Sequence, residues 1–303
     1  MKIKKALMIL LAVLLACGVF PAGSFAEGQN LFLYNVKADG TAEITGISDT
    51  TITALEIPAE LDGIPVTSVG DFAFGHCGSI VSVTIPEGVT SIGTLAFGNC
   101  YILESVSIPD SLVSIGTSAF RSERLTEIVV SPDHPVFAVE NEALIDKRDR
   151  TLVRFLAPEI TGTYEIAQGI RAIGPDAFEL NERLSRLVIP DSVTEIGMDA
   201  MAYCYGLKEI VIPDSVTSIG NLAFFRCTGL ESVTIPDSVT EIGADAFNDC
   251  QSLTAISISP DHPVYEVIDL LVVEKDSKTV IAASGAIRGK AAVPEGKIGR
   301  AHV

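Results

Sequence analysis

The sequence predicts a repeat solenoid, in which short β-strands from successive coils of the chain stack on one another. Three marks recur along it: an Ile-Pro pair, an Ile-Gly pair and an Ala-Phe pair. The Ile-Pro pairs at 85–86 and 108–109 are 23 residues apart, as are those at 189–190, 212–213 and 235–236. A fixed period of this length indicates one repeated unit that buries its apolar edges against its neighbours.

Each mark has a physical role within a coil. Val106 and Ile108 place apolar side chains at alternating positions, as a strand with one buried face requires. Pro109 cannot donate to a strand ladder, so it ends the strand and opens a turn. Gly116 permits a tight reversal, and Phe120 fills the far side of the coil.

Two segments, 131–163 and 259–292, interrupt the repeats predicted at 50–130 and 164–258. Both open on Ser-Pro-Asp-His-Pro-Val, and each contains alternating apolar stretches around a charged turn. This pattern predicts a β-hairpin insert in each segment. Residues 27–49 precede the first repeat and are interpreted as an N-terminal lead-in or cap.

Residues 1–26 have the features of a signal peptide: a basic start, an apolar run over 6–16, and small residues at Ser24 and Ala26. We expect cleavage after Ala26 and a secreted or cell-surface product. No transmembrane segment is expected, because no apolar run approaches the roughly 20 residues required. The tetrapeptide that ends at Cys17 also resembles a lipobox, so a lipid anchor on Cys17 is the alternative.

The last residues, 293–303, break the period. The next Ile-Gly pair follows Val293 by five residues instead of seven, and no Ala-Phe pair comes after it. From Ile298 onward the tail matches a translated sequencing adapter. We therefore expect a truncated repeat with an artefactual tail, in a gene that continues past Gly296.

The net charge of −18 argues against one class of partner. An acidic surface repels nucleic-acid phosphates, so no nucleic-acid binding is expected.

Five cysteines each follow the repeat Phe, or the Met201 that replaces it, by three residues. They are Cys77, Cys100, Cys204, Cys227 and Cys250. Five thiols cannot all pair internally, and parallel Cβ directions in adjacent coils would strain a disulfide. We expect a structural column of buried free thiols. No Cys-x-x-Cys pair or nearby His completes a metal site, so no metal is expected.

No catalytic constellation is evident. His134 and His262 occupy equivalent Asp-His-Pro turns, which we interpret as solvated loops. Asp133 and His134 could belong to a hydrolytic triad only with a nucleophile elbow and an oxyanion loop, and the sequence has neither. Phosphate-binding glycine loops are absent as well. We expect no cofactor and no enzymatic activity.

The full unit reads Leu-x-x-Val-x-Ile-Pro-Asp-Ser-Val-Thr-x-Ile-Gly-x-x-Ala-Phe-x-x-Cys and is clearest over 207–250. It resembles the BspA-like (treponemal-type) leucine-rich-repeat family of bacterial surface proteins, over about residues 50–258. The resemblance implies a right-handed, β-rich leucine-rich-repeat arc with strands on the concave side and short helical or irregular turns on the convex side. It also implies a secreted or cell-surface adhesion module for proteins or glycans of a host or a neighbouring cell.

The candidate binding face is the row of outward positions in and beside the predicted strands, since solenoids commonly bind partners through such faces. Its candidate residues are Glu104, Ser107, Glu127, Arg186, Lys208, Glu209, Glu231 and Thr234. The alternative function is a structural spacer or stalk of a larger cell-wall-associated protein whose functional C-terminal region is missing from this chain.

Overall fold

The structure is a computed structural model that describes residues 31–75, 77–98, 100–268, 271–277 and 280–283. The chain divides into two units, Met1–Leu31 and Phe32–Val303, and the strands belong to the second. The predicted signal peptide, its cleavage site, Cys17 and residues 293–303 lie outside the described residues. The described residues form strands and turns without a helix, so the predicted solenoid is confirmed with irregular turns.

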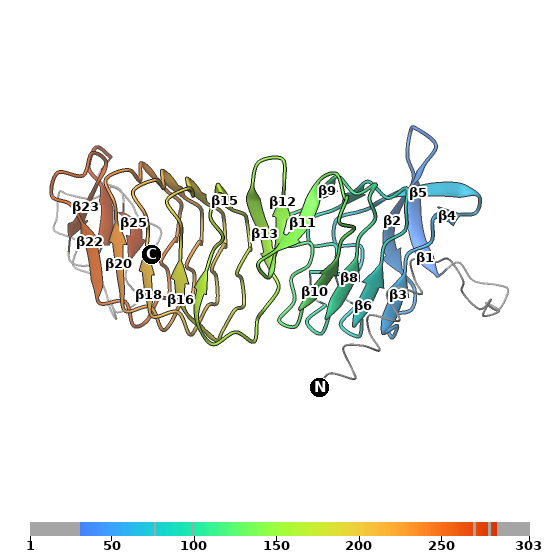
Figure 1. The fold of residues 1–303 in the computed structure, drawn as a ribbon, viewed down its shortest axis with the longest axis horizontal. Helices are drawn as coiled ribbons and strands as arrows, with labels where there is room; N and C mark the ends of the chain where they lie inside the picture. Colours follow the sequence, from blue (N-terminus) through green and yellow to red (C-terminus); the bar gives the residue numbers. More distant parts are fainter. Residues whose placement is uncertain (1–30, 76, 99, 269–270, 278–279, 284–303) are drawn as a thin grey trace. The chain divides into compact units, whose positions relative to one another are not determined.

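The strands that precede the Ile-Pro pairs form parallel sheets, which we call the Ile-Pro ladder (Figure 1). The ladder consists of two sheets among the described residues. The first contains β3 (Ala54–Glu56), β6 (Ser82–Thr84), β8 (Ser105–Ser107) and β10 (Glu127–Val129). The second contains β14 (Gly162–Glu165), β16 (Leu184–Val188), β18 (Glu209–Val211), β20 (Ser232–Ile235) and β22 (Ala255–Ile258).

The structure contains a second ladder that was not predicted from the sequence. Its strands β7, β9, β15, β17, β19 and β21 have two residues each and end on the Ile of an Ile-Gly pair. We call it the Ile-Gly ladder. One of its sheets contains β1 (Phe32–Val36), β2 (Ala42–Ile47), β5 (Ile64–Val69), β7 (Ser91–Ile92) and β9 (Ser114–Ile115), with β4 (Glu60–Leu61) paired to β5. The other contains β11 (Phe137–Glu140), β12 (Ala143–Asp146), β13 (Thr151–Phe155), β15 (Ala172–Ile173), β17 (Glu195–Ile196), β19 (Ser218–Ile219) and β21 (Glu241–Ile242).

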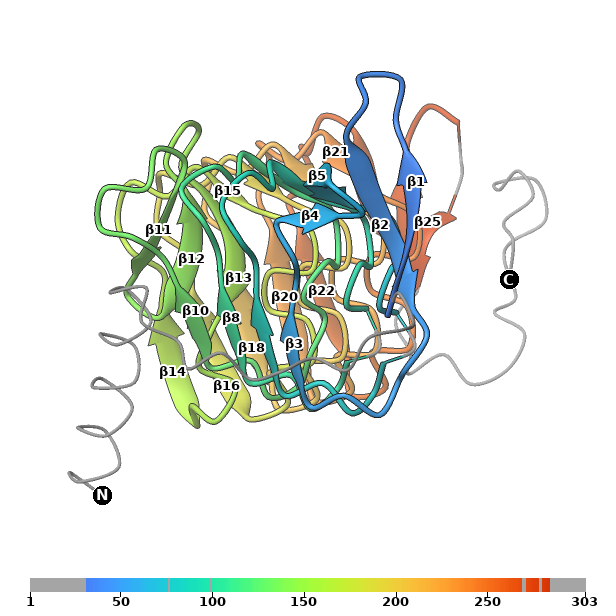
Figure 2. The same cartoon turned by 90° about the vertical axis from the view of Figure 1, so that its right-hand side faces the viewer.

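The core runs between the two ladders as columns of equivalent side chains, and Figure 2 shows successive coils one behind another. The rings of Phe74 and Phe97 stack with centroids 5.1 Å apart, and those of Phe224 and Phe247 stack at 5.0 Å. Met201 takes the same place in its coil and is fully buried. Burial of one large side chain stabilises a fold by about 1.5–3 kcal/mol, and here every coil contributes several.

The glycine of each Ile-Gly pair is required by close packing between coils. A Cβ on Gly116 would lie 2.5 Å from the carbonyl carbon of Gly93, and one on Gly220 would lie 2.5 Å from that of Gly197. Neither has a positive φ, so the expected tight reversal is not the reason for glycine. The left-handed position is two residues before the repeat Phe, as at Leu222 with φ 56°.

Both predicted inserts contain the expected hairpin strands, and each adds one strand before them. In the first insert, β11, β12 and β13 pair in antiparallel order, and β13 then pairs in parallel with β15. The first insert is therefore continuous with the Ile-Gly ladder. In the second, β23 (Tyr265–Ile268), β24 (Leu271–Glu274) and β25 (Val280–Ala283) form a three-stranded antiparallel sheet.

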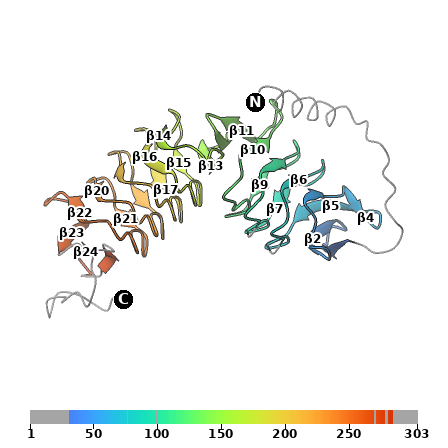
Figure 3. The ribbon, with the colours of Figure 1, turned by 90° about the horizontal axis from the view of Figure 1, so that it is seen from below.

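The first insert divides both ladders. One pair of sheets ends at β9 and β10, and the next pair includes β13 and β14 (Figure 3). We call residues 42–129 the N-terminal block, residues 151–258 the C-terminal block, and their junction the seam. The predicted binding face is therefore two sheets, one in each block.

Candidate functional site

All eight candidate residues lie in the Ile-Pro ladder or directly before one of its strands. All are exposed except Ser107, which is half-buried. The seam separates them into two groups. Glu104, Ser107 and Glu127 belong to the N-terminal block, and the other five belong to the C-terminal block.

In the C-terminal block, strand register brings candidate charges of opposite sign into adjacent positions. Arg186 of β16 lies opposite Glu209 of β18, and the Glu231 N–H donates to the Lys208 carbonyl at 2.9 Å. Beside the Arg186 and Glu209 row lies an apolar row, in which Val211 is 54% exposed. The sheet thus presents parallel rows of charged and apolar side chains, which cross-strand pairing holds in register.

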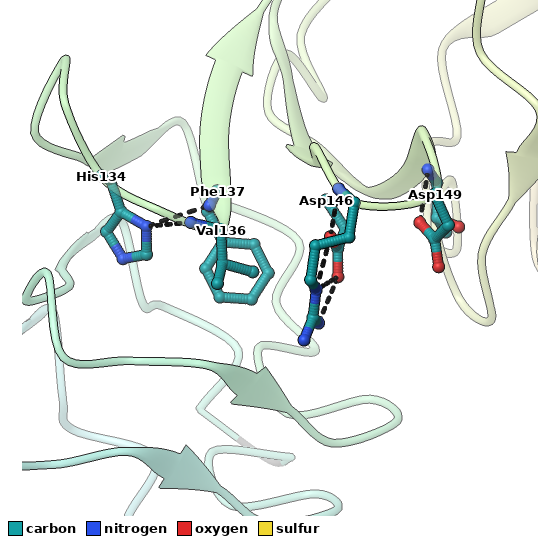
Figure 4. A network of polar contacts seen from close by, with 7 residues as sticks. His134, Val136, Phe137, Asp146 and Asp149 are labelled. Carbon is teal, nitrogen blue, oxygen red and sulfur yellow. Dashed lines mark hydrogen bonds and ion pairs between the residues drawn. The ribbon is translucent and has the colours of Figure 1, made fainter.

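His134 and His262 are buried, so the interpretation of their Asp-His-Pro turns as solvated loops is wrong. His134 is 0% exposed, and its Nδ1 accepts hydrogen bonds from the N–H groups of Val136 and Phe137 at 3.1 and 3.0 Å (Figure 4). Its Nε2 lies 2.9 Å from the Pro109 carbonyl oxygen and donates to it. His262 is equally buried, and its Nδ1 accepts from two backbone N–H groups in the same way. Because both ring nitrogens of His134 are engaged, this imidazole is not placed to act as a base.

Two carboxylates of the first insert, those of Asp146 and Asp149, serve its turns. Asp146 accepts from the Arg148 backbone N–H at 2.9 Å and pairs with its guanidinium at 2.6 Å. Asp149 accepts from the Thr151 N–H at 3.0 Å, and Figure 4 shows both carboxylates turned toward their own loop. Such caps stabilise turns, so each of these two carboxylates is engaged within its own loop.

The five cysteines of the predicted column are buried and free. The Cys204 thiol donates to the Phe178 carbonyl at 3.2 Å, and the Cys250 thiol donates to the Phe224 carbonyl at 3.0 Å. Burial raises the pKa of Cys100 and of Cys204 to about 12. Thiols in this environment remain protonated and are poor nucleophiles and metal ligands.

Within the part of the chain that the structure describes, no group of three or more His, Cys, Asp or Glu side chains is arranged to hold a metal ion. The same residues include no helix with the length and apolarity needed to cross a membrane.

A buried polar network that was not predicted from the sequence lies at the seam. Arg154, only 6% exposed, donates from Nη1 to the Asp176 carbonyl at 2.8 Å and from Nη2 to the Ser122 carbonyl at 2.8 Å. A second link is the ion pair between Arg121 and Glu179, at 2.7 Å. Ser122 and Arg121 follow β9 and the other partners belong to the C-terminal block, so these contacts tie the two blocks together.

The acids of this network are held away from water. Desolvation raises the pKa of Glu179 to about 7 and outweighs the attraction of Arg121. Desolvation also raises the pKa of Asp199 to about 6, with a further contribution from Asp176. The sequence does contain one sign of this network. The position that directly follows the repeat Phe is charged at Arg121 and Glu179, whereas the same position is uncharged in other coils, as at Gly98, Ala202 and Asn248.

Comparison with protein families gives one match. Residues 48–144 and 161–266 match the family described as "BspA type Leucine rich repeat region", in six copies. No curated protein matches the sequence.

Solved structures that match the chain come from several bacteria. The pneumococcal vaccine antigen PcpA is 17% identical over 75% of this chain and 80% of its own, with a TM-score of 0.55. A leucine rich cell surface protein from Faecalibacterium prausnitzii is 22% identical over 79% of this chain and 97% of its own, with a TM-score of 0.39. A leucine rich repeat protein from T. pallidum is 25% identical over 74% of this chain and 88% of its own, with a TM-score of 0.40. The similarity to PcpA supports the solenoid fold alone.

Proposed function

Because the chain belongs to the BspA type leucine-rich repeat family, we propose that it is a secreted or cell-surface binding protein. Its ligand is a protein or glycan of a host or a neighbouring cell, and its role is adhesion instead of catalysis. The signal-like sequence of residues 1–26 supports export.

One observation carries this proposal: the register of exposed rows on the Ile-Pro ladder. Arg186 and Glu209 lie opposite each other, and the Val188–Val211 row runs beside them. An extended partner that crosses the strands meets side chains from equivalent strand positions at intervals of about 4.8 Å. Solenoids use such repeated surfaces for binding, since many weak contacts add along one ligand.

The test is a binding screen of the full chain against immobilised host matrix proteins and mucins. The double variant Arg186→Ala, Glu209→Ala removes the charge row of the Ile-Pro ladder. Its matched control, Arg171→Ala with Glu195→Ala, removes the same residue types from exposed positions of the Ile-Gly ladder. We expect the first variant to lose binding at least tenfold and the control to keep it. Absence of binding by the unmodified chain, or equal losses in the two variants, would contradict the proposal.

A further inference from the structure

The seam leaves one edge of β10 open. Among the described residues, β10 is the last strand of its sheet and pairs with β8 alone. The Glu127 N–H donates to the Glu104 carbonyl at 3.2 Å, and the Ile108 N–H donates to the Val129 carbonyl at 3.1 Å. Successive residues of a strand direct their main-chain groups to opposite edges, so the N–H and carbonyl of Ile128 point away from β8. Such an edge is a template for one more strand.

A second open edge belongs to β11, which Figure 3 draws next to β10. In the part of the chain that the structure describes, β11 is the first strand of its sheet and pairs with β12 alone. The Lys147 N–H donates to the Val136 carbonyl at 2.8 Å, so these two residues form a hydrogen-bonded pair of the antiparallel ladder. Such pairs alternate with non-hydrogen-bonded ones, and Val139 with Leu144 is one of the latter. The N–H and carbonyl of Val139 therefore point away from β12.

A hollow of about 440 Å³ is lined by residues of both open strands. From β10 it receives Val129, which is 41% exposed, and from β11 it receives Val139, which is 44% exposed. Of the residues that line it, Glu127 alone is charged. We call it the apolar hollow. Binding sites for small ligands typically have about 300–1,000 Å³, so this hollow admits a short length of extended chain but no folded domain.

A second hollow, of about 470 Å³, adjoins the start of β10. Thr126 lines it and Glu127 lines the apolar hollow, so the two hollows follow each other along the chain. The charged side chains of this second hollow are all exposed: Glu104, Glu123, Arg124, Glu159, Glu182 and Arg183. Four carboxylates against two guanidinium groups give it a negative potential that attracts cations. We call it the acidic hollow, and the two hollows together the seam groove.

We propose that the seam groove binds an extended peptide segment of a partner protein, which adds a strand to the open edge of β10. Its apolar side chains pack on Val129 and Val139, and its lysine or arginine side chains lie in the acidic hollow. In this mode of recognition the main-chain hydrogen bonds provide affinity, and the contacts of alternate side chains provide specificity. The net charge of −18 disfavours a second copy of this chain as the occupant.

This inference goes beyond the binding role proposed above, because it concerns a different surface. The rows of Arg186 and Glu209 belong to the faces of paired strands, whereas the seam groove offers a strand edge. Peptide binding at the seam therefore does not depend on whether the Ile-Pro ladder binds matrix proteins or mucins.

The probe is a fluorescein-labelled synthetic peptide of alternating valine and threonine with two lysines at one end. One version carries the lysines at its N-terminus and another at its C-terminus, because the added strand can run in either direction. Fluorescence anisotropy measures binding to the full chain. Relative to the tighter version, we expect at least tenfold weaker binding when glutamates replace the lysines. The same loss is expected when every valine and threonine nitrogen is methylated, because methylation removes the main-chain donors.

Two variants test the two parts of the groove. Val129→Ser should weaken binding at least tenfold, and its matched control is Val113→Ser, because Val113 is 44% exposed and lines neither hollow. The double variant Glu123→Gln, Glu182→Gln should weaken binding to a similar extent. Its control, Glu195→Gln with Glu241→Gln, removes the same charge from exposed positions of the Ile-Gly ladder. Both controls should bind the peptide normally, and thermal unfolding checks that each variant is folded.

Hydrogen exchange gives a direct measure of strand addition. The amide of Ile128 should exchange at least tenfold more slowly in the presence of saturating peptide, because its N–H gains a carbonyl partner. Unchanged exchange at Ile128 with the peptide bound would place the peptide elsewhere and overturn the proposal.

Other results would also overturn it: no binding of either lysine peptide, equal binding of the methylated or glutamate peptides, or equal losses in the Val129 and Val113 variants. Dimers of the free chain that Val129→Ser abolishes, seen by sedimentation, would assign the edge to a second copy instead. The double variant Arg186→Ala, Glu209→Ala separates this proposal from the adhesion role. It should bind the peptide normally even where binding to matrix proteins or mucins fails.

Discussion

The guanidinium group of Arg154 donates to the main-chain carbonyl of Ser122 across 2.8 Å, and this bond joins the two repeat blocks. The same side chain bonds the carbonyls of Asp176 and Glu179. Neighbouring repeats otherwise couple through ladder hydrogen bonds, but both ladders are interrupted at the seam. The cooperativity of the solenoid therefore depends on a few side chains at this point.

We expect Arg154→Met to destabilise the seam by about 3 kcal/mol, because it leaves the buried main-chain carbonyl groups of Ser122, Asp176 and Glu179 without their donor. Unfolding of the natural chain in urea should give one transition, and that of the variant should give two, one for each block. Circular dichroism and tyrosine fluorescence follow the unfolding transitions of the natural chain and of the variant. The control is Arg226→Met, which removes the largely exposed ion pair with Asp249 and should cost less than about 1 kcal/mol. A single transition with unchanged midpoint in the Arg154 variant would refute the seam's role.

Stability should fall as the pH rises from about 5 to 8. The pKa of Glu179 is raised from 4.5 to about 7 and that of Asp199 from 3.8 to about 6, so the folded chain binds these protons more tightly than the unfolded chain. Their stabilising contribution is complete below the unfolded values and is lost as the pH passes the folded values. We expect a loss on the order of 2 kcal/mol.

Thermal unfolding of the Glu179→Gln variant tests this pH dependence. Its Tm should vary less between pH 5 and pH 8 than that of the natural chain, since one titrating group is removed. Asp149→Asn, which changes an exposed carboxylate of the insert, should leave the profile as it is. Identical profiles for all three proteins would count against the assignment.

The cysteine column should be inert to thiol reagents while the chain is folded. Burial and a raised pKa keep Cys100 and Cys204 protonated at pH 8, so labelling with a disulfide reagent should be at least a hundredfold slower than for an exposed thiol. Thr234→Cys supplies that exposed thiol as a reference. Denaturant should release all the cysteines for labelling. Rapid labelling of the folded natural chain would instead indicate local opening of the coils.

The two buried histidines, His134 and His262, differ by one hydrogen bond, so their alanine variants should differ in the free energy of unfolding. His134 donates from Nε2 to Pro109, whereas the Nε2 of His262 has no hydrogen-bond partner among the described residues. A buried hydrogen bond contributes about 1 kcal/mol. We expect His134→Ala to lower the free energy of unfolding by about 1 kcal/mol more than His262→Ala does. Urea unfolding of the two variants measures the difference, and equal losses would argue against the Pro109 bond.

The repeated coil could be predicted from the sequence because the residue pairs that define it lie close together in the chain and recur at a fixed period. The Ile-Pro, Ile-Gly and Ala-Phe pairs predicted the position of the Ile-Pro strands and the Phe column, and the alternating apolar stretches around charged turns predicted the hairpins of the inserts. The two-residue strands of the Ile-Gly ladder were missed, since a segment such as Ser91–Ile92 is too short to show alternation. The family match over 48–144 and 161–266 agrees with the predicted repeats.

The seam could not be predicted from periodicity, because its contacts join residues that the insert separates. Arg154 lies in a stretch that alternates like any strand, and its partner Ser122 is 32 residues earlier. The burial of His134 was missed for a similar reason. Its partner Pro109 belongs to an earlier coil, and Asp-His-Pro by itself indicates a solvated turn.

The glycines of the Ile-Gly pairs have a consequence for how such a chain can grow. A Cβ at Gly243 would lie 2.2 Å from the Asn221 backbone nitrogen, so the spacing between coils has almost no tolerance. Changes of length are therefore excluded at the Ile-Gly pairs and must fall elsewhere in a coil, as in the coil from Ile57 to Ile85, which spans 28 residues and places its extra residues around β4. The Ile-Pro ladder therefore lengthens by one strand for each coil that is added. Under the binding role proposed above, the number of coils would set the length of ligand that the ladder can contact.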